Sequence, residues 1–433
     1  MGDAKPSPAR HLTRGLAVFG AGALVLHGWR LGLTLLGSHK RYCIDRNRLA
    51  PADSSRLRDY VSTITDAQVH PDTRVSMLVN GDAFYPSELE TVRAAQHSIN
   101  LQAYEFQEGE ITREFLAALE EQARAGVEVR VVVDALGSWH TRSKYFDGLR
   151  RAGGRFEWYH PVNSREWPYL NHRTHRKLLV VDGTVGFVGG AGFADHWVKP
   201  TKYGRWRDTM FRVEGSVVAA LNSVFAQNWA ETTGEILAGP ENFQYAAAEG
   251  GAPAMVVTSM PHTGATRARI LYQALIESAQ KSIHITTPYF VPDRSARQAL
   301  EHAARRGVSV RILTTGRCND HPLTRRLSHT LERQLLKAGA ALYEYQPSMI
   351  HAKLMTIDGI WTVAGSTNFD HRSFELNHEV NIAMFDRSVA AAVDEQFERD
   401  LANSHSFTLA RQSQRDLIEN IEGDASWVVR REQ

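Results

Sequence analysis

The apolar residues of this chain change their spacing several times, from every second position to every third or fourth. Apolar and polar residues alternate over residues 98–103, as they do in a β-strand. Residues 112–124 place Phe115, Leu116 and Leu119 at helical spacing. Residues 127–133 form a continuous β-branched run, which is typical of a buried parallel strand. Alternation of this kind predicts an α/β architecture.

The second half of the chain repeats the first. Four segments recur in the same order, and each half fits a succession of strand, helix, strand, helix and strand before the last segment. We therefore predict two homologous α/β halves around a pseudo-twofold axis, with one shared active site between them. The matched segments are 97–106 with 281–290, 126–131 with 307–312, 152–159 with 338–345, and 175–179 with 351–355.

The boundary between the halves is expected where Gly, Ala and Pro cluster, at residues 241–254. This cluster follows a helix-like stretch, residues 217–237. We predict a first half over residues 60–240 and a second half over residues 250–405. A charged C-terminal tail, residues 406–433, follows.

Residues 1–40 form a separate N-terminal segment. Basic residues, among them Arg10 and Arg14, precede an apolar run at residues 15–29, which Arg30 interrupts. A spanning helix needs about 20 apolar residues, a length reached here when the charge of Arg30 is tolerated. We favour a membrane anchor over a surface helix. A cleaved signal peptide is the third interpretation, because no small-residue cleavage site follows the apolar run. If this segment spans a membrane, Arg10 and Arg14 predict a cytoplasmic N-terminus.

The composition narrows the possible chemistry. A formal net charge of +2 over 433 residues argues against general coating of nucleic acid, which requires a strongly basic face. Cys43 and Cys318 are the two cysteines, too few for a four-cysteine zinc site and no sign of a disulfide framework. We expect neither a metal nor another cofactor. With 19 histidines in the chain, chemistry based on histidine is the alternative to examine.

The last repeated segment carries the candidate chemistry. It has the pattern His-x-Lys-x-x-x-x-Asp, once from His175 and again from His351. His and Lys two positions apart project from the same face of a strand, so Lys177 and Lys353 would accompany the two histidines. A fixed ammonium neutralises phosphate oxygens, while a histidine attacks phosphorus or moves a proton. Two such pairs in one cleft suffice for covalent catalysis through a phosphohistidine without a metal.

The motif aspartates, Asp182 and Asp358, complete both candidate sites. Each comes an odd number of residues after its histidine and directly before a glycine, so we expect it mainly to fix the turn and the strand. The carboxylate that orients each histidine should then come from elsewhere. The candidates are Asp208 and Glu379, each about 30 residues after one histidine, and such a carboxylate would hold the imidazole in one tautomer.

A turn of small residues follows each motif. In the second half it is residues 365–368, where backbone donors together with Ser366 and Asn368 could hold a phosphate. In the first half it is residues 189–192, which end in Gly192 and contain no asparagine. A single motif of this kind is weak evidence, but two copies at equivalent places in a repeat are much stronger.

These residues resemble the phospholipase D superfamily, and within it the bacterial cardiolipin synthase-like branch. The resemblance covers residues 75–402. Beyond the two motifs, it is carried by residues 206–209, 287–293, 320–323, 348–353 and 377–381.

The resemblance implies two phospholipase D-like halves with distinct roles for the two histidines. By analogy with the family, His175 is the nucleophile and His351 the acid and base, while Lys177, Lys353 and Asn368 bind the phosphate. It implies transfer of a phosphatidyl group from phosphatidylglycerol, or a similar phospholipid, to the hydroxyl of a second lipid at the bacterial inner membrane. It leaves the oligomeric state open.

Three departures from the family pattern keep alternatives open. The first half has Gly192 where the family usually has asparagine, at most one membrane helix is expected where the family commonly has two, and the C-terminal segment is charged rather than apolar. A phospholipase D that hydrolyses phospholipids to phosphatidic acid is therefore the first alternative. A phosphodiesterase or nuclease of the same superfamily is the second.

The choice between lipid and nucleic acid rests on other segments. Residues 156–170 are rich in aromatics, which suit a membrane interface or the wall of a cleft. Arg325, Arg326 and Arg333 could meet anionic headgroups. A nuclease would be more basic. We therefore expect phospholipid substrates and a membrane surface as partners, and no nucleic acid. A binding protein with a dead site is disfavoured, because both motifs keep their His and Lys.

Overall fold

We describe the protein from a computed structural model. It describes residues 41–161, 172–244, 250–260, 265–320 and 332–408. Several predicted features lie outside these ranges: the N-terminal anchor, the second part of the aromatic stretch, Arg325, Arg326 and most of the C-terminal tail. Among the described residues, no helix has both the length and the apolar character needed to cross a bilayer.

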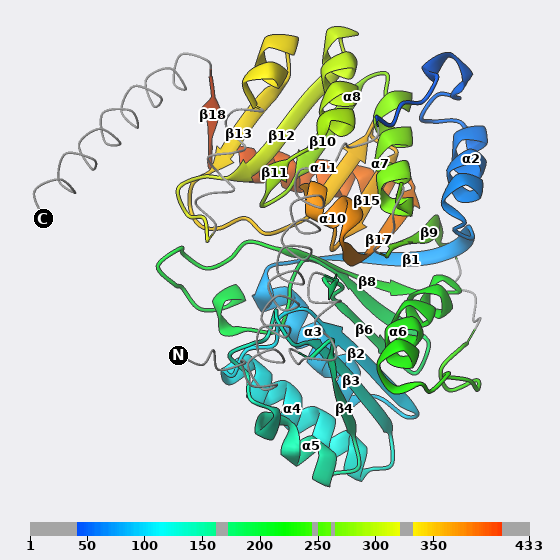
Figure 1. Cartoon of the computed structure of the whole chain (residues 1–433), viewed down its shortest axis with the longest axis vertical. Coiled ribbons are helices and arrows are strands. Elements are labelled where there is room, and N and C mark those ends of the chain that lie inside the picture. The colour runs from blue at the N-terminus through cyan, green and yellow to red at the C-terminus, as the bar shows by residue number, and fades with distance from the viewer. Residues whose placement is uncertain (1–40, 162–171, 245–249, 261–264, 321–331, 409–433) are drawn as a thin grey trace, which may run out of the picture. The chain divides into compact units, whose positions relative to one another are not determined.

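One large mixed sheet runs through both halves of the chain (Figure 1). Along its main path, seven neighbouring strands come from the first half, in the spatial order β4-β3-β2-β6-β7-β8-β1. These strands are β1 (His70–Val79), β2 (Ser98–Ala103), β3 (Glu128–Asp134), β4 (Arg155–Tyr159), β6 (Leu178–Val181), β7 (Val185–Gly189) and β8 (Thr209–Glu214).

The second half contributes its strands in the same order, β13-β12-β10-β14-β15-β17-β9, with β18 added at the outer edge. Strands β1 and β9 pair antiparallel and join the two sets. These strands are β9 (Ala252–Ser259), β10 (Ser282–Thr286), β12 (Ser309–Thr315), β13 (Ala341–Tyr345), β14 (Leu354–Ile357), β15 (Trp361–Gly365), β17 (Asn377–Phe385) and β18 (Ser404–Phe407). The repeat read from the sequence is thus a repeat of topology.

Three short strands lie off this path. Strand β5 (Arg173–Thr174) of the first half pairs with β17 of the second. Strands β11 (Phe290–Val291) and β16 (Phe369–Asp370) form a separate two-stranded sheet.

Helices cover both faces of the sheet. The first half has α2 (Ser55–Thr65), α3 (Gly81–Arg93), α4 (Glu110–Arg124), α5 (Asp147–Arg151) and α6 (Val217–Thr233); the second has α7 (Arg267–Ser278), α8 (Arg294–Arg305), α10 (His371–Glu375) and α11 (Arg387–Leu401). Three short 3₁₀ helices are η1 (Arg46–Arg48), η2 (Ser143–Phe146) and η4 (Asp195–Trp197).

Local chemistry explains where several helices begin and end. Asp293 starts α8 by accepting a hydrogen bond from the amide of Ala296 at 2.9 Å, and Asp386 caps α11 in the same way. Gly234 ends α6 in the left-handed conformation, which glycine adopts without strain. The predicted strands at 98–103 and 127–133 and the helices at 112–124 and 217–237 correspond to β2, β3, α4 and α6.

The apolar core is continuous between the halves. Side chains of α6, together with Val393 of α11, pack on strands of both halves, including Val180 and Phe211 from the first and Val380 and Ile382 from the second. Because helices cover both faces of the sheet, every residue of β2 is buried, including its polar positions. The polar face of β2 therefore carries internal hydrogen bonds, such as that from Asn100 Nδ2 to Asn222 Oδ1 at 2.9 Å.

Candidate active site

Each His-x-Lys segment is held against the opposite half of the molecule. His175 follows β5, and its amide donates to the carbonyl of His378 in β17 at 2.9 Å. His351 precedes β14, and its amide donates to the carbonyl of Arg207 at 2.6 Å. The two motifs are therefore not solvated strand ends. Both histidines are more than nine-tenths buried and line one shared cavity.

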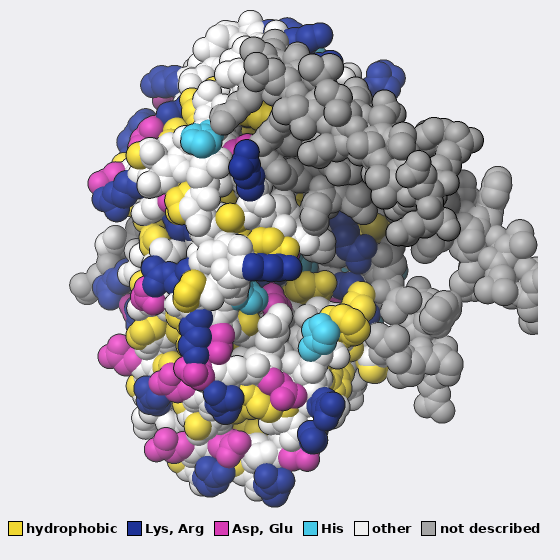
Figure 2. Space-filling model, turned by 90° about the vertical axis from the view of Figure 1, so that its left-hand side faces the viewer, with side chains coloured by type: hydrophobic (Ala, Val, Ile, Leu, Met, Phe, Trp, Pro, Cys, Tyr) yellow, Lys and Arg dark blue, Asp and Glu magenta, His cyan; other side chains and the backbone are white. Residues whose placement is uncertain are grey.

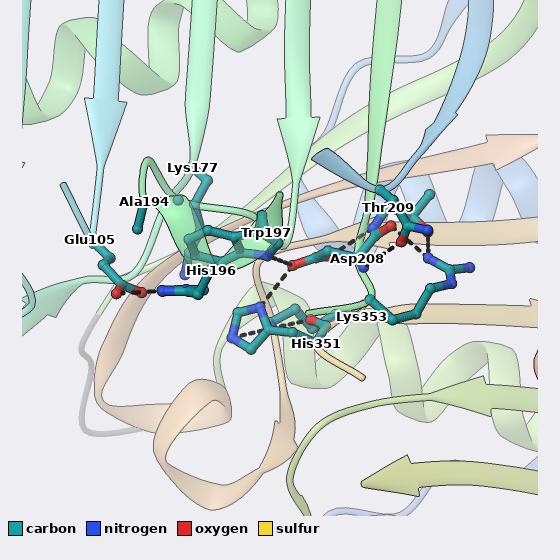
Figure 3. Close-up of polar contacts among 12 residues, drawn as sticks. Glu105, Lys177, Ala194, His196, Trp197, Asp208, Thr209, His351 and Lys353 are labelled. Atoms are coloured by element: carbon teal, nitrogen blue, oxygen red, sulfur yellow. Dashed lines mark hydrogen bonds and ion pairs between the residues drawn. The ribbon is translucent and has the colours of Figure 1, made fainter. Parts of the chain in front are cut away.

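The two histidines exchange carboxylate partners between the halves. His175 Nδ1 lies 3.0 and 3.1 Å from the two carboxylate oxygens of Glu379. His351 Nδ1 lies 2.8 Å from Asp208 Oδ2 (Figure 3). The two predicted carboxylates are in place. The spacing along the chain predicted that each histidine would pair with the carboxylate of its own half, His175 with Asp208 and His351 with Glu379. That assignment is wrong, because β5 and the segment before β14 cross to the opposite half.

Further donors fix the two carboxylates. Glu379 accepts a hydrogen bond from the hydroxyl of Ser366 and a longer one, 3.4 Å, from Asn377 Nδ2. Asp208 accepts from the indole Nε1 of Trp197 at 3.1 Å and from the amide of Thr209 at 2.8 Å (Figure 3). A carboxylate that accepts several hydrogen bonds is stabilised in its charged form. Despite complete burial, the pKa values of Asp208 and Glu379 are accordingly lowered.

Each motif lysine folds back onto its own histidine. Lys177 Nζ donates to the carbonyl of His175 at 2.7 Å and lies 5.2 Å from the ring centre of Tyr104. Lys353 Nζ donates to the carbonyl of His351 at 2.5 Å and lies 3.1 Å from both ring nitrogens of that histidine. Both lysines are 2% exposed. Lys177 lines the cavity, whereas Lys353 is not among the lining residues. Burial lowers the pKa of Lys177 well below its usual value, with a further contribution from Lys353.

Burial decides the protonation of this group. It lowers the pKa of His175 to about 4, against the opposing effect of Glu379. It lowers the pKa of His351 to about 3, with a further contribution from Lys353. The pKa of Lys353 falls to about 8, again chiefly through burial. At neutral pH both imidazoles are therefore neutral, and with Nδ1 on a carboxylate each has its lone pair on Nε2, which in His351 lies 3.1 Å from Lys353 Nζ.

The cavity has a volume of about 440 Å³. Of the predicted residues, His175, Lys177, His351 and Asn368 line it. Ser366 does not, because its hydroxyl is behind the histidine, on Glu379. The cavity has other lining residues to which the sequence interpretation gave no catalytic or binding role, although it expected residues 287–293 near the mouth of the site. For Tyr104 and Glu105 after β2, and Leu136 after β3, the position just past a strand end was the available signal. The other lining residues are Tyr104, Glu105, Leu136, Trp206, Tyr289, Asp320, Asp370, Arg372, Ser373 and Asn377.

Asp182 and Asp358 lie at the other end of their strands and are absent from the cavity lining. Each adopts a left-handed backbone conformation with φ of 53°. Asp182 accepts three amide hydrogen bonds from residues 96–98, at 2.7 to 2.9 Å, and Asp358 accepts three from residues 280–282, at the same distances. These contacts bind the turn to the start of β2 and β10, as the sequence predicted for a structural role.

One group among the described residues has the spacing of metal ligands: Asp293, His371 and Glu375. Arg269 already forms ion pairs with both carboxylates of this group, with Asp293 and, at 2.9 Å, with Glu375. A guanidinium in this position neutralises the charge that a cation would require. The donor set therefore fits a structural ion-pair cluster better than a metal site.

Comparison with known proteins gives consistent matches. The model of a family described as cardiolipin synthase, PLD-like domain, matches residues 89–229 and 272–401. A probable cardiolipin synthase of Bacillus subtilis is 33% identical over 82% of this chain and 71% of its own length. A cardiolipin synthase of a Geobacillus species is 35% identical over 80% of this chain and 69% of its own.

The fold is similar to that of solved structures with low sequence identity. The crystal structure of phosphatidylserine synthase from Haemophilus influenzae superposes with a TM-score of 0.64 at 14% identity, over 86% of this chain and 98% of the other. Polyphosphate kinase from Porphyromonas gingivalis superposes with a TM-score of 0.54 at 13% identity, over 78% of this chain and 49% of the other. At such identities the similarity concerns the fold alone.

Proposed function

Because this chain belongs to the cardiolipin synthase family with phospholipase D-like domains, we propose that it transfers a phosphatidyl group between phospholipids through a phosphohistidine. The observation that carries the proposal is the meeting of His175 and His351 in one cavity, each with Nδ1 on a buried carboxylate. The exchanged pairing makes the site dependent on both halves at once.

His175 is the proposed nucleophile. Its Nε2 attacks phosphorus of the donor phospholipid, the bond to the headgroup oxygen breaks, and His351 gives a proton to the leaving alcohol. The lysines 177 and 353 and Asn368 neutralise and hold the phosphate oxygens. Glu379 stabilises the positive charge that develops on the ring of His175. Ser366 contributes through Glu379 rather than through the phosphate.

His351 then reverses its role. It takes the proton of an acceptor hydroxyl, the acceptor oxygen attacks phosphorus, and the bond to His175 breaks. Burial and the charge of Lys353 lower the pKa of His351. An anionic phosphodiester in the cavity counteracts Lys353 and so favours the protonated acid needed for the first step. Asp208, with its indole donor, stabilises that protonated form.

Several surface features support a membrane substrate. Leu136 lines the cavity and is 39% exposed, and Trp139, three residues further on, is 72% exposed. Aromatic side chains in such positions suit the interface of a membrane. On the face shown in Figure 2, the Lys and Arg side chains of the described residues are interspersed with Asp and Glu, unlike a nucleic-acid surface. We propose the bacterial inner membrane as the location, with residues 1–40 as anchor.

The test uses the full chain with phosphatidylglycerol vesicles and EDTA, and mass spectrometry of the lipid products. Cardiolipin together with glycerol is the expected result. Phosphatidic acid alone would identify a hydrolase instead. Cleavage of DNA without lipid turnover would overturn the proposed function, and loss of activity with EDTA would overturn a metal-free mechanism.

A further inference from the structure

The two halves differ where the small-residue turns face the cavity. By the register of the repeat, Gly192 of the first half corresponds to Asn368 of the second. A Cβ atom at Gly192 would lie 2.7 Å from the carbonyl oxygen and 3.1 Å from the Cβ of Glu105. The glycine is therefore needed because Glu105 occupies the space that a side chain would take. The residue equivalent to Glu105 in the second half is Tyr289, which is not acidic.

Glu105 lines the cavity, and only one of its two carboxylate oxygens has a hydrogen-bond donor among the described residues. Its Oε1 accepts a hydrogen bond from Gln107 and lies 3.8 Å from Nε2 of His196 (Figure 3). Among the described residues, no group donates to its Oε2. The side chain is 17% exposed and lines the cavity. Oε2 is thus available to a hydrogen-bond donor on a bound molecule.

Glu105 follows Tyr104, whose ring lies 5.0 Å from that of His175, and two aromatic rings connect it to His351. The ring of His196 lies 4.0 Å from that of Trp206, and the ring of Trp206 lies 5.1 Å from that of His351. In the proposed mechanism both the leaving and the attacking alcohol bind next to His351. Glu105 and His351 line the same cavity, so a second hydroxyl of an alcohol bound next to His351 can reach the free carboxylate oxygen.

The chemistry of the substrate limits what this oxygen can bind. Phosphate and acyl ester oxygens of a phosphatidyl group are acceptors, and a carboxylate repels the phosphate. Hydroxyl groups of a glycerol headgroup are donors and fit an acceptor oxygen. Burial raises the pKa of Glu105 to about 7, so part of its negative charge is removed near the phosphate, and the protonated form can also donate.

We propose that Glu105 binds a second, non-reacting hydroxyl of the alcohol. Through this contact it selects polyol acceptors such as glycerol over simple alcohols. This proposal rests on the proposed phosphatidyl transfer. In this proposal the first half contributes the selection of the alcohol through Glu105, whereas the second half contributes phosphate binding through Asn368. The reacting hydroxyl stays next to His351, and the neighbouring hydroxyl donates to Glu105 Oε2.

The experiment measures an internal ratio, which does not depend on the fraction of folded protein. Phosphatidylglycerol vesicles are incubated with equal concentrations of deuterated glycerol and 1-propanol, and mass spectrometry compares labelled phosphatidylglycerol with phosphatidylpropanol. In Glu105→Leu, the preference for glycerol should fall about tenfold, as expected for one lost hydrogen bond. Glu105→Gln keeps an acceptor oxygen and should retain most of the preference. Glu105→Ala, a second variant without the carboxyl, should lose it.

The matched control is Glu108→Gln, an exposed residue of the same segment that is not among the cavity-lining residues. It should keep the ratio of the unmodified protein. An unchanged preference in both Glu105→Leu and Glu105→Ala would overturn the role of Glu105. If the unmodified protein forms neither product and no cardiolipin, the proposed function fails instead, so the two failures are distinguishable.

Discussion

The two half-sites have the same three proposed catalytic groups but different neighbouring residues. Each half supplies a histidine, a lysine and a carboxylate for the opposite histidine. Around Glu379 the further donor is the hydroxyl of Ser366, whereas around Asp208 it is the indole of Trp197. Gly190, the equivalent of Ser366, has no room for a side chain, because a Cβ there would lie 2.4 Å from Asp208 Oδ1.

This comparison shows how a duplicated unit acquires two roles. The repeat provides two equivalent His-Lys pairs, which alone would make a symmetric site. The neighbours then distinguish them: Trp197 and Trp206 border His351, while Tyr104, Ser366 and Asn377 border His175 or its carboxylate. The proposal assigns the nucleophile to one of these surroundings and the acid and base to the other.

The largest effects should come from the histidines. We expect His175→Ala to lose at least about 10⁴-fold in rate with every donor, because no nucleophile remains. His351→Ala should lose about 10²- to 10⁴-fold with phosphatidylglycerol. With a p-nitrophenyl phosphatidyl ester, whose leaving group needs no proton, it should still form the phosphoenzyme. Peptide mapping of the trapped phosphohistidine checks both; a label on His351 would reverse the two roles.

The carboxylates test the exchanged pairing. Glu379→Gln and Asp208→Asn should each lower kcat about 10³-fold, because the amide favours the wrong tautomer of its histidine. Pre-steady-state release of p-nitrophenol separates them: Glu379→Gln should slow the first step, and Asp208→Asn the transfer to alcohol. If Asp208→Asn slowed the first step and Glu379→Gln did not, each carboxylate would act within its own half.

The donors to the carboxylates should have smaller effects. Trp197→Phe and Ser366→Ala each remove one hydrogen bond to a buried carboxylate, and we expect kcat to fall about tenfold. In burst kinetics, Ser366→Ala should affect phosphoenzyme formation and Trp197→Phe its breakdown. Trp229, whose indole donates to Glu235 and which does not line the cavity, and the exposed Ser223 supply matched controls, Trp229→Phe and Ser223→Ala. Equal effects of both variants on both steps would contradict the division of roles.

The smallest effect on activity is expected at Asp182 and Asp358. Replacement by Asn leaves one acceptor oxygen for three amide donors, which should lower the free energy of unfolding by about 2 kcal/mol. Because both residues lie away from the cavity, kcat of the folded protein should remain close to that of the unmodified chain. Denaturant unfolding measures the free energy of unfolding, and assays at low temperature measure kcat of the folded protein. A loss of kcat comparable to that of Glu379→Gln would contradict a structural role.

The sequence by itself determined the α/β class and the repeat, and it supplied the residues that we propose as the reacting groups. Periodic apolar residues identify β2, β3, α4 and α6, because each of these elements buries one regular face or a continuous run. The motif identifies His175, Lys177, His351 and Lys353, because the chemistry depends on residue type at a fixed spacing. The turn role of the motif aspartates followed from the glycine after each.

The tertiary structure alone decided which residues meet. Asp208 and Glu379 were found from their residue type, but their assignment to the opposite histidine depends on β5 pairing with β17 and on the bridge between Arg207 and Ile350. Ser366 was expected at the phosphate and lies behind Glu379 instead. Glu105 and Trp197 belong to no motif. Contacts between residues about 10² positions apart are set by strand pairing and packing, which local sequence patterns do not encode.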